Sequence, residues 1–237
     1  MKNIYVRNVL VNLDLTMEKG EFLLVLGDNG AGKTTLFNTI SGAIQPSQGS
    51  IFIDSEDVTD KTQFQRANLV ANVFQDPKVG TVSKMTLREN MNLAYMRGKK
   101  RALSACCSEE RDELFREKLS ELKMGLEDRL DSYAGELSGG QRQALSIAMA
   151  FLTDSKILLL DEITAALDRV NSEKIMNIVY KKCQRTCKTC LMITHSPRII
   201  EQFENNVAVL ENGKIFKSFQ KKHQLKESVN SLNFTKY

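Results

Sequence analysis

A glycine-rich loop near the start of the chain constrains the fold more than any other part of the sequence. The apolar run Phe-Leu-Leu-Val-Leu at residues 22–26 has the length of a strand and leads directly into Gly27-Asp-Asn-Gly-Ala-Gly-Lys-Thr-Thr35. Leu36, Phe37 and Ile40 then recur at helical spacing. The loop matches the pattern G-x-x-x-x-G-K-[ST] in full. The order strand, loop, helix therefore predicts a phosphate-binding loop and disfavours a glycine-rich turn that binds nothing.

Each residue type in this phosphate loop, residues 27–35, has a physical reason to be there. Glycines let the backbone turn its N–H groups inward, and the helix that opens at Gly32 presents further donors and a positive dipole end. Lys33 supplies a point charge for the β- and γ-phosphates of a nucleotide, and Thr34 supplies a hydroxyl for Mg²⁺. The candidate nucleotide-binding residues are Gly27, Asp28, Asn29, Gly30, Ala31, Gly32, Lys33, Thr34 and Thr35.

A second segment, Lys156-Ile-Leu-Leu-Leu-Asp-Glu162, predicts an apolar strand that ends in two adjacent carboxylates. Side chains alternate along a strand, so Asp161 and Glu162 can point in different directions. We expect Asp161 to hold Mg²⁺ and Glu162 to act as general base toward an attacking water. Such a strand end on its own is more often merely solvated. The phosphate loop upstream favours the catalytic interpretation, because nucleotide hydrolysis needs a metal carboxylate.

A third segment, Leu137-Ser-Gly-Gly-Gln-Arg-Gln143, precedes the almost wholly apolar residues 144–152, which predict a buried helix. Its two glycines open a second helix N-terminus with exposed N–H donors, and Ser138 is a natural cap. The segment therefore predicts a second anion site. Two phosphate-binding helix ends in one chain indicate either two ligands or one ligand clamped between two copies of the chain.

Composition and charge exclude several classes of protein. Of the 237 residues, 42% are hydrophobic, which is ordinary for a chain that buries a core and excludes disordered and collagen-like proteins. The longest uninterrupted apolar run is six residues, far short of a bilayer span, so we expect no membrane-spanning helix. Charged residues interrupt the N-terminal segment, which argues against a secretory signal peptide and for the cytoplasm. The net charge of +4 suits an anionic ligand and an inner membrane surface equally.

Three cysteines form a possible ligand run. Cys183, Cys187 and Cys190 have a C-x3-C-x2-C spacing that resembles the iron–sulfur ligand run of radical enzymes. They straddle a predicted helix end and the start of a buried strand, and the sequence contains no second ligand set. Free cysteines in a reducing compartment are usually small core residues, which is the interpretation that we favour.

Taken together, the three chemistry-bearing segments resemble the ATP-binding subunit of ABC transporters. They are residues 27–34, Leu137-Ser-Gly-Gly-Gln141, which is that family's signature, and Leu160-Asp-Glu162. The resemblance spans residues 10–217. It implies an α/β P-loop NTPase fold with a RecA-like core, an antiparallel β subdomain and a helical subdomain. It also implies an ATPase that converts ATP and water to ADP and phosphate, with ATP and Mg²⁺ as cofactors.

Three shorter segments agree with this resemblance. Val73-Phe-Gln-Asp-Pro77 resembles the family's glutamine loop, Ala166-Leu-Asp168 resembles its D-loop, and Ile193-Thr-His195 resembles its switch histidine. Considered alone, His195 would be a structural histidine and Gln75 an ordinary polar residue before a turn. Only their positions relative to the other motifs indicate a function.

The resemblance implies a role for each of these residues. Gln75 would contact Mg²⁺ and the attacking water and link the ATP state to a transmembrane partner. His195 would hold the γ-phosphate and help to position Glu162, and Asp168 would organise the opposite site across a dimer interface. The predicted catalytic residues are Glu162, His195, Gln75 and Lys33, and the predicted Mg²⁺ ligands are Thr34, Gln75 and Asp161.

The resemblance also implies partners. In the implied head-to-tail homodimer, two ATP molecules lie at the interface, each held by one subunit's phosphate loop and the other subunit's Ser138, Gly139, Gly140 and Gln141. Such a dimer would explain two anion sites in one chain. The further partners are a separate integral membrane permease and, indirectly, an extracytoplasmic solute-binding protein; no nucleic acid is expected. We expect an importer subunit bound peripherally at the cytoplasmic face of the inner membrane, since exporters often fuse the ATPase to membrane helices.

Two alternatives belong to other functional classes. One is a soluble ABC-type ATPase that acts on nucleic acid, ribosomes or cofactor assembly. Such relatives usually carry two cassettes, a long heptad-bearing insertion or zinc fingers, and the sequence shows none of these. The other is a nucleotide-binding regulator that does not hydrolyse, which the presence of Glu162, His195 and Gln75 argues against.

We expect a single ABC ATPase domain over residues 1–237. Its nucleotide-binding core with the β subdomain covers residues 1–81 and 153–216, its helical subdomain covers residues 82–152, and residues 217–237 form a polar tail.

Three short segments add local detail. Thr86-Leu-Arg-Glu89 predicts a capping box at the start of a helix. Asn212-Gly213 predicts the tight turn of a last hairpin. The basic run Arg97-Gly-Lys-Lys-Arg101 is either a solvated face or a contact with a membrane partner or lipid phosphates, and the solvated face is the commoner case.

The sequence departs from the family pattern at its start and after the signature. The chain starts too late for the family's first strand and adenine-stacking aromatic, so we expect residues 9–15 to be the following strand and Tyr5 to be a poor candidate for stacking. The start site is then either Met1 or one further upstream. Ala144 and Met149 stand where many members have arginine. With Gly80-Thr81 after the glutamine loop, this resembles a bacterial subgroup for aromatic amino acid uptake.

Overall fold

The computed structural model describes residues 1–7, 9–97, 108–202 and 206–218. The chain divides into two compact units, which are described separately below. Unit 1 contains residues 1–66 and the residues from Thr189 onward, and unit 2 contains residues 67–188. Within the described residues, no helix has both the length and the apolar character needed to cross a bilayer.

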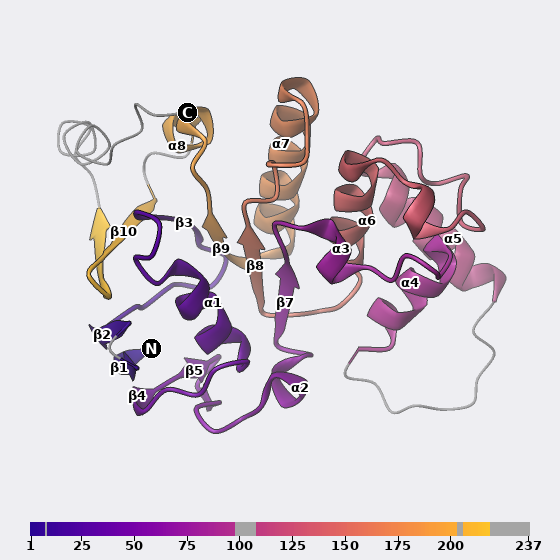
Figure 1. The fold of residues 1–237 in the computed structure, drawn as a ribbon. Coiled ribbons are helices and arrows are strands. Elements are labelled where there is room, and N and C mark those ends of the chain that lie inside the picture. Colours follow the sequence, from indigo (N-terminus) through magenta and orange to yellow (C-terminus); the bar gives the residue numbers. More distant parts are fainter. Residues whose placement is uncertain (8, 98–107, 203–205, 219–237) are drawn as a thin grey trace. The chain divides into compact units, whose positions relative to one another are not determined.

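Unit 1 is built on parallel strands that carry the phosphate loop (Figure 1). The order of its larger sheet is β11-β10-β3-β9, with β3, β9 and β10 parallel and β11 antiparallel at the edge. Every residue of β3 is buried, as expected for a strand of a parallel sheet that is covered on both faces. The strands of this sheet are β3 (Phe22–Leu26), β9 (Thr189–Ile193), β10 (Val207–Glu211) and β11 (Lys214–Ser218). The helices of unit 1 are α1 (Lys33–Ser41), α2 (Gln63–Arg66) and α8 (Pro197–Gln202).

A smaller antiparallel sheet, β2-β1-β4, completes unit 1 and corrects one expectation. We expected the family's first strand to be missing, but β1 (Lys2–Val6) pairs with both β2 (Leu10–Leu13) and β4 (Gln48–Ser50). Pairing on both sides holds this strand, and its buried Ile4 and Val6 flank the half-buried Tyr5. The second strand lies within residues 9–15, as predicted. A two-stranded ladder of β5 (Phe52–Ile53) and β6 (Glu56–Asp57) follows.

Unit 2 contains a pair of parallel strands, β7 (Val70–Val73) and β8 (Ile157–Asp161). They pair in register from Val70 opposite Ile157 to Val73 opposite Leu160. The long helix α7 (Arg169–Thr186) comes after β8 and ends at Cys187, which adopts the left-handed conformation. The predicted helix end between Cys183 and Cys190 is therefore confirmed. Cys183 and Cys190 are buried and Cys187 is exposed.

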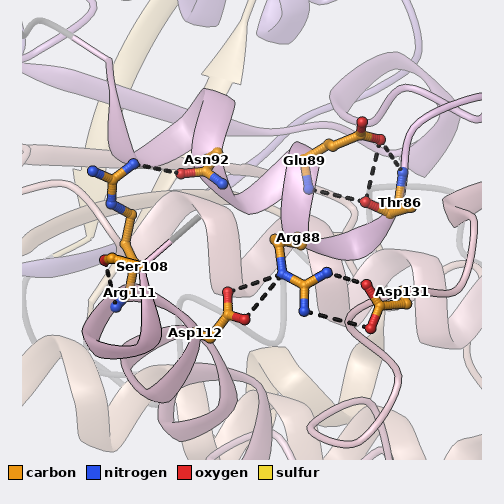
Figure 2. A network of polar contacts seen from close by, with 8 residues as sticks. All are labelled: Thr86, Arg88, Glu89, Asn92, Ser108, Arg111, Asp112 and Asp131. Atoms are coloured by element: carbon orange, nitrogen blue, oxygen red, sulfur yellow. Dashed lines mark hydrogen bonds and ion pairs between the residues drawn. The ribbon is translucent and has the colours of Figure 1, made fainter. Parts of the chain in front are cut away.

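Three helices of unit 2 pack against α6 (Gly139–Phe151), whose residues 142–151 are all buried. They are α3 (Pro77–Gly80), α4 (Leu87–Tyr95) and α5 (Glu109–Ser120), and a 3-10 turn, η1 (Ala134–Glu136), precedes α6. The predicted capping box of α4 is present, since Thr86 accepts from the Glu89 N–H and Glu89 accepts from the Thr86 N–H. Figure 2 shows this cap beside Arg88, which binds Asp112 of α5 and Asp131.

Other predictions have mixed outcomes. The last hairpin is confirmed. Asn212 and Gly213 both have positive φ, as the two-residue turn that matches the right-handed twist of the flanking strands requires. Most of the basic run and nearly all of the predicted tail lie outside the described residues. The subdomain boundaries at residues 81–82 and 152–153 remain predictions.

Candidate functional site

The phosphate loop lies between β3 and α1 in a conformation that glycine makes possible. Gly32 is the N-cap of α1 at φ +101°, and as glycine it has no side chain that would occupy the first-turn N–H groups. A Cβ at Gly27 would lie 2.4 Å from the Leu210 carbonyl oxygen, so β10 also requires glycine there. Backbone donors at a helix N-terminus are therefore arranged as a phosphate site needs.

Lys33 lies folded back across this loop. Its Nζ donates hydrogen bonds to the carbonyl oxygens of Gly27 (2.6 Å) and Asp28 (2.9 Å), and its side chain is buried. The loop thus places a cation beside its own backbone, where an anion would find charge and N–H donors together. The remaining loop residues differ in exposure: Asp28, Asn29, Gly30 and Thr34 are exposed, whereas Ala31 and Thr35 are half-buried.

His195 follows the strand beside the phosphate loop. In the parallel pair β3 and β9, Val25 lies opposite Ile193. Gly27 and His195 each come two residues after these partners, so both follow the same edge of the sheet. Carboxyl ends of neighbouring parallel strands are the usual place for ligand sites in such sheets. Unit 1 therefore contributes the phosphate loop and the predicted switch histidine from adjacent strands.

Gln75 and Glu162 meet in unit 2 by the same arrangement. Val73 of β7 lies opposite Leu160 of β8, and each candidate residue comes two positions later. The Gln75 Nε2 donates to the Glu162 Oε2 at 3.0 Å. Glu162 adopts φ +43°, a sparsely populated conformation for a residue with a side chain, and Asp161 ends β8 half-buried. Two residues separated by 87 positions are thus brought into direct contact.

The signature, residues 137–141, opens α6. The Ser138 Oγ accepts from the Gln141 N–H at 3.2 Å, and the Gln141 Oε1 accepts from the Ser138 N–H at 3.3 Å. The predicted Ser138 cap is confirmed as one half of a capping box. The two glycines lie against the predicted D-loop: a Cβ at Gly140 would come within 2.8 Å of the Leu167 Cδ2. Sequence analysis did not predict this contact.

Asp168 caps α7. Its carboxylate accepts from the Asn171 N–H at 3.0 Å and from the Asn171 Nδ2 at 2.6 Å. These two hydrogen bonds lower the pKa of the exposed Asp168 carboxyl. The residue therefore has a structural task in its own chain, in addition to any task across an interface.

Three further residues support the site and were not predicted. Arg66 is fully buried and donates to the carbonyl oxygens of Thr39 (2.8 Å) and Ile40 (2.9 Å), so it caps the far end of the helix that opens at the phosphate loop. Burial lowers the pKa of this guanidinium. Arg142 and Gln143 follow the signature; Arg142 binds Thr81, after Gln75, and Gln143 binds the Phe74 carbonyl oxygen, directly before Gln75. Their position directly behind the signature was the available indication.

Comparison with known proteins places these motifs in a family. The family model described as "ABC transporter" matches residues 10–165. The chain is 39% identical over 207 residues to the tyrosine transport ATP-binding protein of Clostridioides difficile strain R20291, covering 87% of this chain and 82% of that protein. It is 34% identical to the thiamine import ATP-binding protein ThiQ of Shigella sonnei strain Ss046, covering 86% and 83%.

A solved structure of an ATP-binding cassette supports the same family. A dimeric ATP-binding cassette in a post-hydrolysis state, bound to ADP and Pi, aligns with a TM-score of 0.79 and 28% identity. The alignment covers 93% of this chain and 97% of that one.

Proposed function

The chain belongs to the ABC transporter family as an ATP-binding ATPase subunit, and we propose that it powers the import of a small solute through a separate membrane permease. The thiamine relative, an import ATP-binding protein, supports the direction of transport. The tyrosine relative also supports an aromatic amino acid as the class of solute, in agreement with the subgroup resemblance at Ala144 and Met149.

One observation carries the catalytic part of this proposal. The Gln75 amide and the Glu162 carboxylate meet at 3.0 Å at the carboxyl ends of parallel β7 and β8. Glu162 takes a proton from a water as that water's oxygen bonds to the γ-phosphorus, and the bond from that phosphorus to the β–γ bridging oxygen breaks to release ADP. Lys33 and the phosphate-loop N–H groups bind the β- and γ-phosphates, and His195 contacts the γ-phosphate.

The chemistry of the proposed donor set fits Mg²⁺. Thr34, Gln75 and Asp161 offer a hydroxyl, an amide oxygen and a carboxylate, which are the hard oxygen ligands that this ion prefers. The Gln75 amide nitrogen, not its oxygen, faces Glu162, so the oxygen is the atom offered to the ion. When bound, Mg²⁺ would neutralise charge on the β- and γ-phosphate oxygens.

A head-to-tail homodimer completes each site. Ser138, Gly139, Gly140 and Gln141 of one copy would face the γ-phosphate of an ATP held by the other copy's phosphate loop, with Asp168 at the same interface. The exposed Ser138 and Gly139 at a helix N-terminus support this assignment. The dimeric cassette with ADP and Pi supports it from comparison.

The proposed assembly lies at the cytoplasmic face of the inner membrane. The chain binds there peripherally to an integral permease, and a solute-binding protein outside the membrane delivers the solute. ATP closes the dimer, closure changes the permease conformation, and hydrolysis reopens the dimer. No observation favours the alternative of an ATPase that acts on nucleic acid, ribosomes or cofactor assembly.

The test is Glu162→Gln in the purified full chain. Loss of the base should lower kcat by about a hundredfold to ten-thousandfold, while ATP still binds and holds the variant as a dimer. Steady-state phosphate release gives kcat, and light scattering with and without ATP gives the dimer fraction. Hydrolysis at the parent rate would refute the role of Glu162.

Lys33→Ala is the control for binding. It should lose ATP affinity itself, because it removes the cation that lies across the phosphate loop. Undiminished ATP affinity, measured by calorimetry, would contradict the phosphate-loop assignment.

A further inference from the structure

We propose that Gln143, assisted by Arg142, is a positioning residue for Gln75, and that it links the signature helix to the glutamine loop of the same chain. The inference rests on the proposed catalytic role of Gln75 and names the residues that hold it in place.

The first contact is made at the peptide group before Gln75. The Gln143 Nε2 donates to the carbonyl oxygen of Phe74 at 3.2 Å. That carbonyl belongs to the planar peptide unit that also contains the Gln75 N–H. Fixing the Phe74 oxygen therefore fixes the plane from which the Gln75 side chain departs toward Glu162.

The second contact is made at the other end of the segment. The Arg142 Nε donates to the Thr81 Oγ1 at 2.6 Å, and its Nη2 donates to the Thr81 carbonyl oxygen at 3.2 Å and the Ser83 Oγ at 2.7 Å. The Thr81 Oγ1 in turn donates to the Pro77 carbonyl oxygen at 2.7 Å. A buried guanidinium thus holds the end of α3 and the residues after it against α6.

The middle of the segment lies close to the same helix. A Cβ at Gly80 would come within 2.7 Å of the Ser146 Oγ. The segment from Phe74 to Ser83 is thus hydrogen-bonded to α6 at its start and end and packs closely against it at Gly80. Because α6 opens at the signature, a displacement of the signature helix moves the peptide that carries Gln75.

In the Gln143 amide, the nitrogen and not the oxygen makes the hydrogen bond, which is the one to the Phe74 carbonyl oxygen. Gln143 is fully buried, and its Oε1 has no hydrogen-bond partner among the described residues. Such an unpartnered buried oxygen is costly, and an apolar side chain of the same shape would avoid the cost. A glutamine at this position is explained by what its Nε2 holds, which is the peptide before Gln75.

This orientation makes Gln143→Met an informative variant. Methionine keeps the volume, removes the donor to Phe74 and also removes the unpartnered oxygen, so the stability effects oppose each other. We expect the melting temperature to change by less than about 4 °C. We expect kcat to fall about tenfold, because Gln75 loses its orientation, while KM for ATP stays within about twofold. A purely structural role would lower the melting temperature and leave kcat per folded molecule unchanged.

The decisive comparison is a double-variant cycle in the full chain with saturating ATP and Mg²⁺. If Gln143 acts through Gln75, adding Gln143→Met to Gln75→Ala will slow hydrolysis no further than Gln75→Ala alone. If the double variant instead hydrolyses ATP more slowly than Gln75→Ala by the same factor that Gln143→Met alone produces, the inference is overturned. Asn92→Leu is the matched control, because it deletes another buried amide of unit 2, one that accepts from Arg111 (Figure 2), and should leave kcat unchanged.

The cycle separates failure of the inference from failure of the proposed function. If Gln75→Ala slows hydrolysis and Gln143→Met does not, only the inference is wrong. If Gln75→Ala hydrolyses ATP at the parent rate, the proposed role of Gln75 fails, and the inference falls with it.

Two further measurements keep the test independent of that one variant. Amide hydrogen exchange of the segment from Phe74 to Ser83 should accelerate in Gln143→Met, and unchanged exchange there would count against the proposal. Should that variant not fold, Arg142→Lys keeps the charge but loses the forked contact with Thr81 and Ser83, and should lower kcat about threefold. An unchanged kcat in a folded Arg142→Lys would overturn the proposed role of Arg142.

Discussion

At the scale of single residues, several side chains of the candidate site also make stabilising contacts within their own chain. Glu162 keeps a left-handed backbone conformation, a strain that persists only where its surroundings hold it, and the contact with Gln75 is one such restraint. Lys33 is held by two loop carbonyls, and Asp168 caps α7. Each of these arrangements orders a group before any ligand is bound, which lowers the entropic cost of binding.

Asp168 gives a prediction about pH. Its hydrogen bonds with Asn171 lower the pKa of the carboxyl below its ordinary value of 3.8, so the cap stabilises the folded chain fully above that pH. The contribution is lost as the pH falls from about 4 through the lowered pKa. Asp168→Asn keeps an oxygen for the Asn171 N–H but has no charge to lose.

The variant should therefore have a lower urea midpoint than the parent at pH 7. The difference should shrink as the pH is lowered stepwise below about 4. A difference in urea midpoint that stays constant over that range would show that the charge of the cap contributes nothing.

At the scale of elements, Arg88 joins α4 to α5 and to the segment that carries Asp131. The Arg88 Nε donates to both carboxylate oxygens of Asp112, at 2.9 and 3.1 Å, and its guanidinium also pairs with Asp131 (Figure 2). These hydrogen bonds raise the pKa of Arg88, and the bond with Asp112 contributes the most. The two carboxylates differ in exposure, since the Asp112 side chain is 18% exposed and the Asp131 side chain 80%.

This difference predicts unequal costs for two matched substitutions. Asp112→Asn should lower the free energy of unfolding by about 1–2 kcal/mol, because it weakens a charge-assisted, partly buried bond. Asp131→Asn should cost no more than about 0.5 kcal/mol, because water screens an exposed pair. Urea denaturation of the two variants measures both values. Equal losses would show that burial does not decide the strength of these pairs.

The elements also show what sequence reasoning can reach. The capping box at Thr86, the cap at Ser138 and the turn at Asn212 were predicted because their hydrogen bonds join residues within three positions. The contact of Gln75 with Glu162 was not predicted; the sequence analysis only assigned both residues to the same attacking water. The strand β1 was missed because its evidence is pairing with β4, more than 40 residues away, and not a clear local apolar pattern.

The supporting side chains were harder still to foresee. Arg66, Arg142 and Gln143 act on backbone carbonyls or hydroxyls brought close by the fold, and no pattern in the neighbouring sequence indicates which partners they meet. For Arg142 and Gln143 the partners lie 61 and 69 residues away. Long-range packing decides such contacts, and local propensity does not.

At the scale of the whole molecule, the candidate site residues are divided between the two units. Unit 1 carries the phosphate loop and His195, and unit 2 carries Gln75, Asp161, Glu162, the signature and Asp168. The family fold and the ATPase class followed from three motifs in order, and the comparisons confirm both. The solute did not follow from any residue of the chain, because an ATPase subunit meets nucleotide and permease, not solute.

The most direct test of the central claim, an ATPase subunit that drives a separate permease, is to recover the tagged chain from detergent-solubilised membranes of its own host and identify what accompanies it. The account predicts recovery of a multi-span membrane protein, together with ATPase activity that Glu162→Gln abolishes. Recovery of soluble partners alone, with the ATPase activity intact, would contradict it.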